Sequence, residues 1–297
     1  MGILLGLTAA VCWGVSDFAA RFAARRLGSY RVSFFIQPIG FVALNFFLWA
    51  SGGFGHLFTV HGWQAWSWTI AVGVMNAACS VCFYHALEIG VLAIVAPITT
   101  SYPALTLILS LITGERLGAL RCVALVCILV GVVLAATSFP PENISAENAG
   151  AAHKHHHPLS RGVGWALGAA VLMGVMFWML GFEVVPRVGV WSPVWVIRLT
   201  SFAILGLTAK PVRQTIALPK GNVWWLLGVV GVLDTSAFVA NNFALQWGPL
   251  SVVTVLASLF SAVTVLLACI FLRERLERTQ WAGIILILSG IAIVNWR

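Results

Sequence analysis

Eight residues with ionisable or hydrogen-bonding side chains lie inside long apolar runs of this chain. They are Asp17, Asn76, Tyr84, His85, Arg198, Asp234, Asn241 and Asn242. A charged side chain at the centre of a bilayer costs about 2.5–3.5 kcal/mol on insertion scales, so each one needs a partner or a function. Amides, imidazoles and phenols can bind an ammonium, a carboxylate or an amide group of a solute. The set therefore indicates a site for substrate binding or ion coupling.

The charged residues also have structural interpretations. Asp234 could anchor a hydrogen bond or an ion pair, although we favour proton exchange for it because it lies near the middle of its apolar run. Asp17 has Arg21 one helical turn away and could pair with it or reach the membrane interface. Arg198 could bind substrate or simply pair with a carboxylate. For Asp17 and Arg198 both interpretations stay open.

The uncharged polar residues have the same two uses. Tyr84, His85, Asn241 and Asn242 either face a cavity or join neighbouring helices. The stretch Thr99-Thr-Ser-Tyr-Pro103 combines hydroxyls with a proline, which is typical of a helix break beside a cavity or of a simple kink.

The amino-acid composition indicates whether these residues fold in water or in a membrane. The chain has 297 residues, 60% hydrophobic and only 9% charged, with a mean hydropathy of +0.97. Soluble domains average about 45–50% apolar and about 25% charged residues, so a bilayer is indicated. The net charge of +8 comes from scattered Lys and Arg, which we interpret as topology signals and not as a nucleic-acid surface.

Apolar runs separated by charge, Pro or Gly predict ten transmembrane helices. Within lipid every backbone N–H and C=O must be paired internally, and a helix does this within its own segment. The predicted spans are 3–22, 31–50, 66–87, 91–113, 119–138, 161–182, 190–209, 223–245, 249–271 and 278–296. The motif Gly164-x-x-x-Gly168 is a helix-packing signal within the sixth.

The two halves of the chain repeat each other. Ala86-Leu-Glu-Ile-Gly90 overlies Ala244-Leu-Gln-Trp-Gly248, and Ile36–Leu44 overlies Ile197–Leu205, at offsets of 158 to 161 positions. We therefore divide the chain into a repeat at 1–138, a polar linker loop at 139–160 and a repeat at 161–297. Because each half has an odd number of spans, the fold class is all-α with two inverted five-helix repeats, and a substrate site is expected between them.

Several residues make the chain resemble the EamA-type branch of the drug/metabolite transporter superfamily. They are Trp13-Gly14 in the first span, Glu115 and Glu274 closing the fourth and ninth, and Gly131 and Gly290 in the fifth and tenth. The resemblance implies a ten-helix carrier of small metabolites, often an exporter, with amino acids among the substrates of some members. An arginine is common in the family's second and seventh spans; Arg198 fits, whereas Gln37 departs from the pattern.

These observations predict a secondary transporter in the inner membrane. It moves a small metabolite, such as an amino acid or a related amphipathic compound, by alternating access, and export and proton coupling are further hypotheses. The alternative is a membrane enzyme or a channel-like protein, but the chain lacks His-Glu-x-x-His, Gly-x-Ser-x-Gly and phosphate-binding loop motifs. We expect no cofactor and no resident metal, since the cluster from His153 to His157 lacks neighbouring Cys or carboxylate ligands.

Three smaller expectations concern span ends and orientation. Glu115 and Glu274 lie beside arginines, and we favour interfacial ion pairs over proton coupling for them. Trp13 lies deeper in its span and could stack on a ligand, although packing is the use that we favour. Connections after odd-numbered spans hold twelve Lys and Arg, and the other side, both termini included, holds four. Because cytoplasmic connections carry the excess, this count puts both termini outside. The family resemblance implies the reverse.

Overall fold

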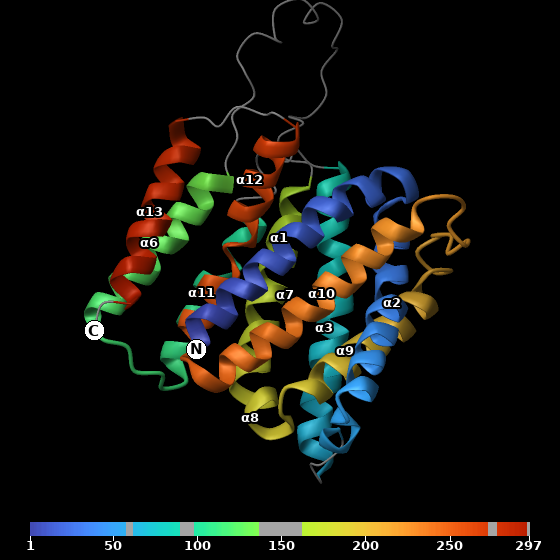
Figure 1. Ribbon diagram of the computed structural model, residues 1–297, viewed down its shortest axis with the longest axis horizontal. Helices are drawn as coiled ribbons and strands as arrows, with labels where there is room; N and C mark the ends of the chain where they lie inside the picture. The colour runs from blue at the N-terminus through green and yellow to red at the C-terminus, as the bar shows by residue number, and fades with distance from the viewer. Residues whose placement is uncertain (58–61, 90–97, 137–161, 273–277, 296–297) are drawn as a thin grey trace, which may run out of the picture.

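The computed structural model describes residues 1–57, 62–89, 98–136, 162–272 and 278–295. Within these ranges every regular element is helical, as the apolar runs predict (Figure 1). The first half contains α1 (Gly2–Leu27), α2 (Ser29–Ala50), the 3-10 turn η1 (Gly53–His56), α3 (Trp63–Ile89), α5 (Tyr102–Ile112) and α6 (Ala119–Ala136). The second contains α7 (Val163–Met179), the π turn η5 (Leu180–Val184), α8 (Val185–Val188), α9 (Trp191–Thr208), α10 (Trp224–Trp247), α11 (Leu250–Ala257), α12 (Phe260–Leu272) and α13 (Arg278–Asn295).

Six of these helical segments are long and apolar enough to cross a membrane. They are Gly2–Leu27, Ser29–Ala50, Trp63–Ala86, Val163–Val188, Trp191–Thr208 and Trp224–Trp247. Shorter apolar helices cover Ile98–Ile112, Ala119–Leu134, Leu250–Thr264 and Trp281–Ile291. The chain is therefore an integral, multi-pass membrane protein. The predicted total of ten spans stays a prediction, as does the linker at 139–160, which lies outside the described residues.

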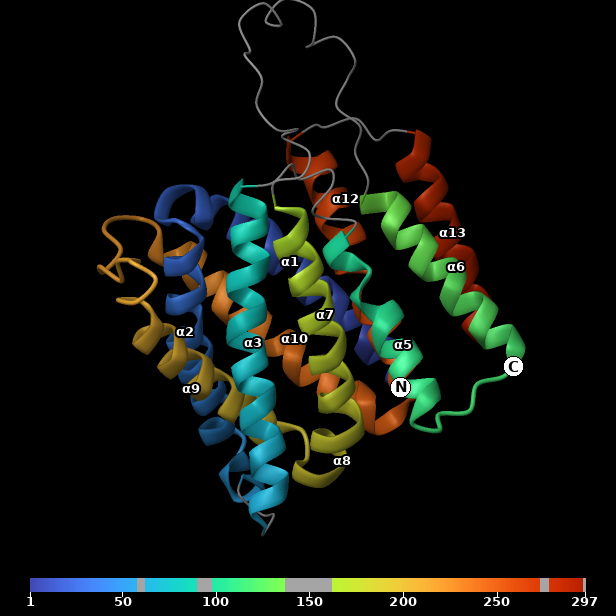
Figure 2. The same cartoon turned by 180° about the vertical axis from the view of Figure 1, so that it is seen from behind.

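The helix contacts reflect the internal repeat. α1 packs along α10, and α3 packs along α7; α2 contacts α9, α5 contacts α11, and α6 runs beside α13 at one edge (Figures 1 and 2). Figure 1 shows that α1 and α7, the first helices of the two halves, cross the bundle in opposite senses. This is the arrangement that an inverted repeat requires.

Two apolar runs are interrupted at corresponding positions. The predicted span 249–271 is two helices, because α11 ends at Ala257 and α12 begins only at Phe260. The Ser258 hydroxyl donates to the Val255 carbonyl at 2.8 Å, the kind of local bond that competes with helix continuation. In the first half, a turn at Ser101 precedes α5, whose second residue, Pro103, has no N–H to donate. Tyr102 and Phe260 begin the helices after the two breaks, 158 positions apart.

The positions of the two chain ends bear on the orientation of the protein in the membrane. The start of α1 and the end of α13 lie at one end of the bundle, and the connections α1–α2 and α9–α10 lie at the other. Arg31 at the start of α2 donates from Nη2 to the Ala217 carbonyl at 2.5 Å, which joins those two connections. The basic residues at these two connections thus cluster at one end of the described bundle.

From this clustering we expect both termini to face away from the cytoplasm. An alkaline phosphatase fusion after Arg297 should be active and a green fluorescent protein fusion dark. The same reporters inserted after Arg213, in the α9–α10 connection, should give the opposite pattern. Fluorescence from the C-terminal fusion would show that the charge count misleads and that the family pattern holds.

Candidate functional site

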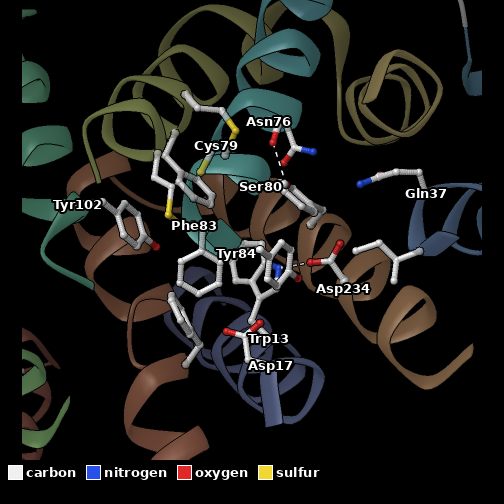
Figure 3. A pocket seen from close by; sticks show the side chains of 16 residues that line it. Trp13, Asp17, Gln37, Asn76, Cys79, Ser80, Phe83, Tyr84, Tyr102 and Asp234 are labelled. Atoms are coloured by element: carbon white, nitrogen blue, oxygen red, sulfur yellow. Dashed lines mark hydrogen bonds between the residues drawn. The ribbon is translucent and has the colours of Figure 1, made fainter. Parts of the chain in front are cut away.

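A cavity of about 90 Å³ lies between the two repeats. This is several times the ~10–15 Å³ that one water needs. Its wall comes from α1, α2, α3, α5, α7, α10 and α12 (Figure 3). The side chains with polar groups in the wall are Trp13, Asp17, Gln37, Asn76, Cys79, Ser80, Tyr84, Tyr102 and Asp234. The apolar ones are Ile36, Phe83, Met173, Met176, Phe177, Phe238 and Phe260.

Asp234 is held by bonds from two other helices. Arg198 Nη2 on α9 donates to Asp234 Oδ2 at 2.5 Å, and the Trp13 indole Nε1 on α1 donates to Oδ1 at 2.9 Å. The Arg198 side chain is fully buried, whereas that of Asp234 is 19% exposed. A buried guanidinium needs a counter-ion, and Asp234 supplies it while its carboxylate borders the cavity. The structural interpretation of Arg198 as an ion-pair partner is therefore the one that the geometry shows.

Gln37 completes this cluster from α2. Arg198 Nη1 donates to Gln37 Oε1 at 3.0 Å, and Gln37 Nε2 donates to the Ser33 carbonyl at 3.3 Å. Gln37 and Arg198 occupy corresponding positions of the two repeats, 161 positions apart. An arginine at position 37 would place a second positive charge beside Arg198. The amide oxygen of Gln37 instead accepts a hydrogen bond from Arg198. The departure from the family pattern is thus part of the network.

Asp17 lies one helical turn after Trp13 on α1 and also lines the cavity. Within the described part of the chain, its carboxylate has no hydrogen-bond or ion-pair partner. The cavity therefore has two carboxylates in different settings. Asp234 is neutralised by Arg198, whereas Asp17 has no counter-ion among the described residues.

Asn76 occupies in the first repeat the position that Asp234 has in the second. Its Nδ2 donates to the Ser201 hydroxyl at 2.9 Å, and Ser201 donates to the Gly73 carbonyl at 3.2 Å. Ser80, one turn further on, donates to the Asn76 carbonyl at 2.8 Å. Asn76, Ser80 and Tyr84 are spaced by four residues, so one face of α3 presents all three to the cavity.

Aromatic rings form much of the wall. Trp13 meets Phe177 and Phe238 edge-on at centroid distances of 5.7 and 5.2 Å. Phe177 is stacked on Tyr102 at 5.2 Å. The Tyr102 side chain is buried, and its hydroxyl has no hydrogen-bond partner in the described structure. A buried hydroxyl without a partner is costly, so it marks a place where a bound molecule or water can supply one.

Four predicted site residues are not among those that line the cavity. One is Arg198, which is fully buried and pairs with Asp234. His85 on α3 lies edge-on to Trp165, with ring centroids 5.0 Å apart. Asn242 Nδ2 donates to the Val190 carbonyl at 3.0 Å, which joins α10 to the start of α9. Asn241 is buried on α10, and its side-chain amide has no partner among the described residues. For Asn242 the geometry matches the helix-joining interpretation.

Glu115 has a different partner from the one expected. Its carboxylate accepts from the Ser251 hydroxyl at 2.9 Å and from the Ser251 backbone N–H at 3.3 Å, at the first turn of α11. A carboxylate at a helix N-terminus satisfies free N–H groups and faces the positive end of the helix dipole. Glu274 and the cluster from His153 to His157 lie outside the described residues. Within the described ranges, no group of His, Cys, Asp and Glu could hold a metal ion.

Spacing in the sequence could have identified some cavity residues that the sequence analysis does not select. Trp13, for which packing is predicted, lies four residues before Asp17, as Ser80 lies four residues after Asn76. This spacing places each pair on one helix face. Tyr102 could be noticed only as part of the polar break before α5. The apolar lining residues are not distinguishable from ordinary core residues in the sequence.

These features define a polytopic membrane protein with a solute-sized cavity between two repeats. The model of the EamA-like transporter family matches residues 1–137 and again residues 160–296, so the chain belongs to the EamA-like transporter family. Membership of this family implies that the protein transports small molecules across a membrane and does not catalyse a reaction.

The comparisons with solved structures agree on the fold. A structure titled "Crystal structure of protein" is similar, with a TM-score of 0.73, 19% sequence identity, and coverage of 99% of this chain and 97% of that chain. At this identity the likeness shows the fold alone. No curated protein matches the chain.

Proposed function

We propose that this protein is a secondary transporter that exports a small amphipathic metabolite by alternating access. The substrate binds in the cavity between the repeats, and protons are the coupling ion. The observation that carries this proposal is the pair of helix breaks at corresponding positions, before Tyr102 and before Phe260, both of which line the cavity. Interrupted helices in matching positions of two inverted halves are the best pointer to a transporter's binding site.

The breaks give each repeat a hinge beside the substrate. α5 and α11 contact each other, and α11 also contacts α1, so movement at either break changes the wall of the cavity. Thr264 on α12 donates to the Gly14 carbonyl of α1 at 3.1 Å, which ties the segment after the second break to the helix that carries Trp13 and Asp17. Rocking of one half against the other would open the cavity to each side in turn.

The carboxylates of Asp17 and Asp234 are the groups to which we assign proton coupling. Both border the cavity, so both can exchange protons with water or with a substrate that enters it. Ionisable residues at this depth in a membrane typically belong to substrate or proton pathways. Antiport follows if substrate and proton compete for the same carboxylates.

Transport by purified protein in vesicles tests the proposal. Proteoliposomes loaded with amino acids, amines, nucleosides or sugars should show saturable counterflow with at least one class of solute. An inward-directed proton gradient should accelerate net efflux, and a pH dye should report proton entry that depends on the solute. Chemical conversion of the solute without a gradient effect would indicate an enzyme, and flux that never saturates would indicate a channel.

A further inference from the structure

The charges around the cavity identify a substrate class, on the premise that the cavity is the transport site proposed above. We infer that the transported compound carries a single positive charge, as an ammonium group, on an apolar and preferably aromatic body. Asp17 is the counter-ion for the ammonium group. The rings from α3, α7 and α12 receive the apolar body.

The first argument is electrostatic balance. Among the described residues that line the cavity there are two carboxylates, Asp17 and Asp234, and no Lys, Arg or His. Arg198 neutralises Asp234 but is fully buried and does not line the cavity. The carboxyl group of Asp17 is left without a counter-ion in the described structure. In a low-dielectric site an uncompensated charge is expensive, so a cation, either a substrate or a proton, is the preferred occupant beside it.

The second argument is that the cavity cannot bind a substrate carboxylate through Arg198. Its Nη1 and Nη2 atoms are bonded to Gln37 and Asp234, and its guanidinium lies against the Phe238 ring, 5.4 Å from the centroid. Its Nε is buried and has no hydrogen-bond partner among the described residues, and α2 covers it at Gly40, where an added Cβ would lie 3.1 Å from the Nε. An anionic or zwitterionic solute would therefore place its carboxylate near Asp17 and Asp234 without a cation to receive it. This disfavours both free acids and amino acids.

The third argument comes from the uncharged wall. Phe83, Phe177 and Phe260 lie on α3, α7 and α12, and the Phe177 ring is stacked with that of Tyr102. Aromatic faces attract ammonium groups and pack against apolar rings. The unpartnered Tyr102 hydroxyl can accept a hydrogen bond from an N–H group. Figure 3 shows Tyr102 and Asp234 on opposite sides of the cavity, with Asp17 and Trp13 below.

Binding to four solutes of similar shape but different charge tests the inference. The purified transporter in detergent is titrated calorimetrically at pH 7 with 2-phenylethylamine, 2-phenylethanol, 3-phenylpropionate and phenylalanine. The amine should bind at least about tenfold more tightly than each of the others, since it alone offers a lone cation to the carboxyl group of Asp17 and charge-assisted hydrogen bonds are the strong ones. Tighter binding of the acid or of phenylalanine overturns the inference.

Variants locate the counter-ion. Asp17→Asn should reduce affinity for 2-phenylethylamine by at least about tenfold and leave that for 2-phenylethanol unchanged. Glu183→Gln, which neutralises a carboxylate that pairs with Arg187 away from the cavity, should bind like the wild type. Asp17→Glu keeps the charge and should retain most of the affinity, which separates a charge effect from misfolding. Unchanged amine binding by Asp17→Asn overturns the assignment.

The outcome for substrate class is separable from the outcome for transport. If vesicles show saturable counterflow of an acid or a sugar but none of any amine, the protein is a carrier and the cationic substrate is wrong. If no solute shows saturable counterflow, the proposed function itself fails. Counterflow of amines that disappears in Asp17→Asn but persists in Glu183→Gln supports both.

Discussion

Replacing Asp234 by asparagine is expected to abolish transport while the protein still inserts and folds. The carboxylate joins three helices, because it accepts from Trp13 on α1 and from Arg198 on α9 while lying on α10. Asparagine keeps one oxygen, which can accept one of these two bonds, but it replaces the other oxygen with an NH₂ group and removes the negative charge. Arg198 then stays buried without a counter-ion. The measurements are counterflow in proteoliposomes and the unfolding midpoint in detergent. Full activity of Asp234→Asn with unchanged coupling to protons would show that the residue is only structural.

Two further variants separate the effect of charge from the effect of geometry at the Arg198–Asp234 ion pair. Asp234→Leu removes the acceptor as well as the charge and should destabilise the protein by about 3–5 kcal/mol, as expected when one partner of a buried ion pair is deleted. The double variant Arg198→Met with Asp234→Leu should regain much of that loss without regaining transport. If the two substitutions add independently, the residues do not act as a pair.

Hydropathy located the helices well because the bilayer imposes one strong requirement on every span. α2 occupies Ser29–Ala50 where the apolar run predicts 31–50, and α9 occupies Trp191–Thr208 where it predicts 190–209. Family membership was also predictable, since Trp13-Gly14, Glu115 and Gly131 occur in the spans where the resemblance requires them. What hydropathy could not show is the break between α11 and α12, because Ser258 and Leu259 scarcely interrupt an apolar run.

The candidate site was only partly predictable, for a reason that the Trp13–Asp234 bond illustrates. Asp17, Asn76, Tyr84 and Asp234 are polar residues in apolar runs, and all of them line the cavity. Trp13 was not selected because an indole is ordinary in a membrane helix, and its partner lies 221 positions away in the sequence. Contacts over such separations depend on how the two repeats pack. No local pattern encodes them.

The glycines show that the sequence is equally limited in predicting which helices pack closely. The motif Gly164-x-x-x-Gly168 predicts a close helix contact, yet a Cβ at either glycine would meet no atom of the described residues within 4 Å. Close contacts lie at other glycines, and one of them is where Gly40 of α2 meets Gly231 of α10. A Cβ on Gly40 would lie 2.2 Å from Thr235 Oγ1, 3.0 Å from the Gly231 carbonyl oxygen and 3.1 Å from Arg198 Nε. The spacing rule identifies where a helix can approach another, but the partner decides whether it does.

This contact supports the prediction with the largest expected effect on packing. Gly40→Ala should lower stability by about 1–3 kcal/mol, the usual penalty for overpacking a filled interior, and should reduce transport as well. The added methyl has no room, because Thr235 Oγ1 already donates to the Gly231 carbonyl at 2.6 Å and is held in place. α2 must therefore move away from α10, and with it Gln37, which accepts a hydrogen bond from Arg198.

Two glycines on α10 provide a matched comparison for this variant. A Cβ on Gly231 would lie 2.9 Å from Ile39 Cγ2 and 3.1 Å from the Ile36 carbonyl oxygen, whereas a Cβ on Gly228 would meet nothing within 4 Å. Gly231→Ala should therefore behave like Gly40→Ala, and Gly228→Ala should unfold at the wild-type temperature or slightly above it, since alanine favours helix. Unfolding midpoints in detergent and counterflow rates measure both effects. Equal midpoints for all three variants would mean that α2 and α10 are not in close contact. In that case α2 would not support the cluster formed by Gln37, Arg198 and Asp234, and Arg198 would not be held away from the cavity.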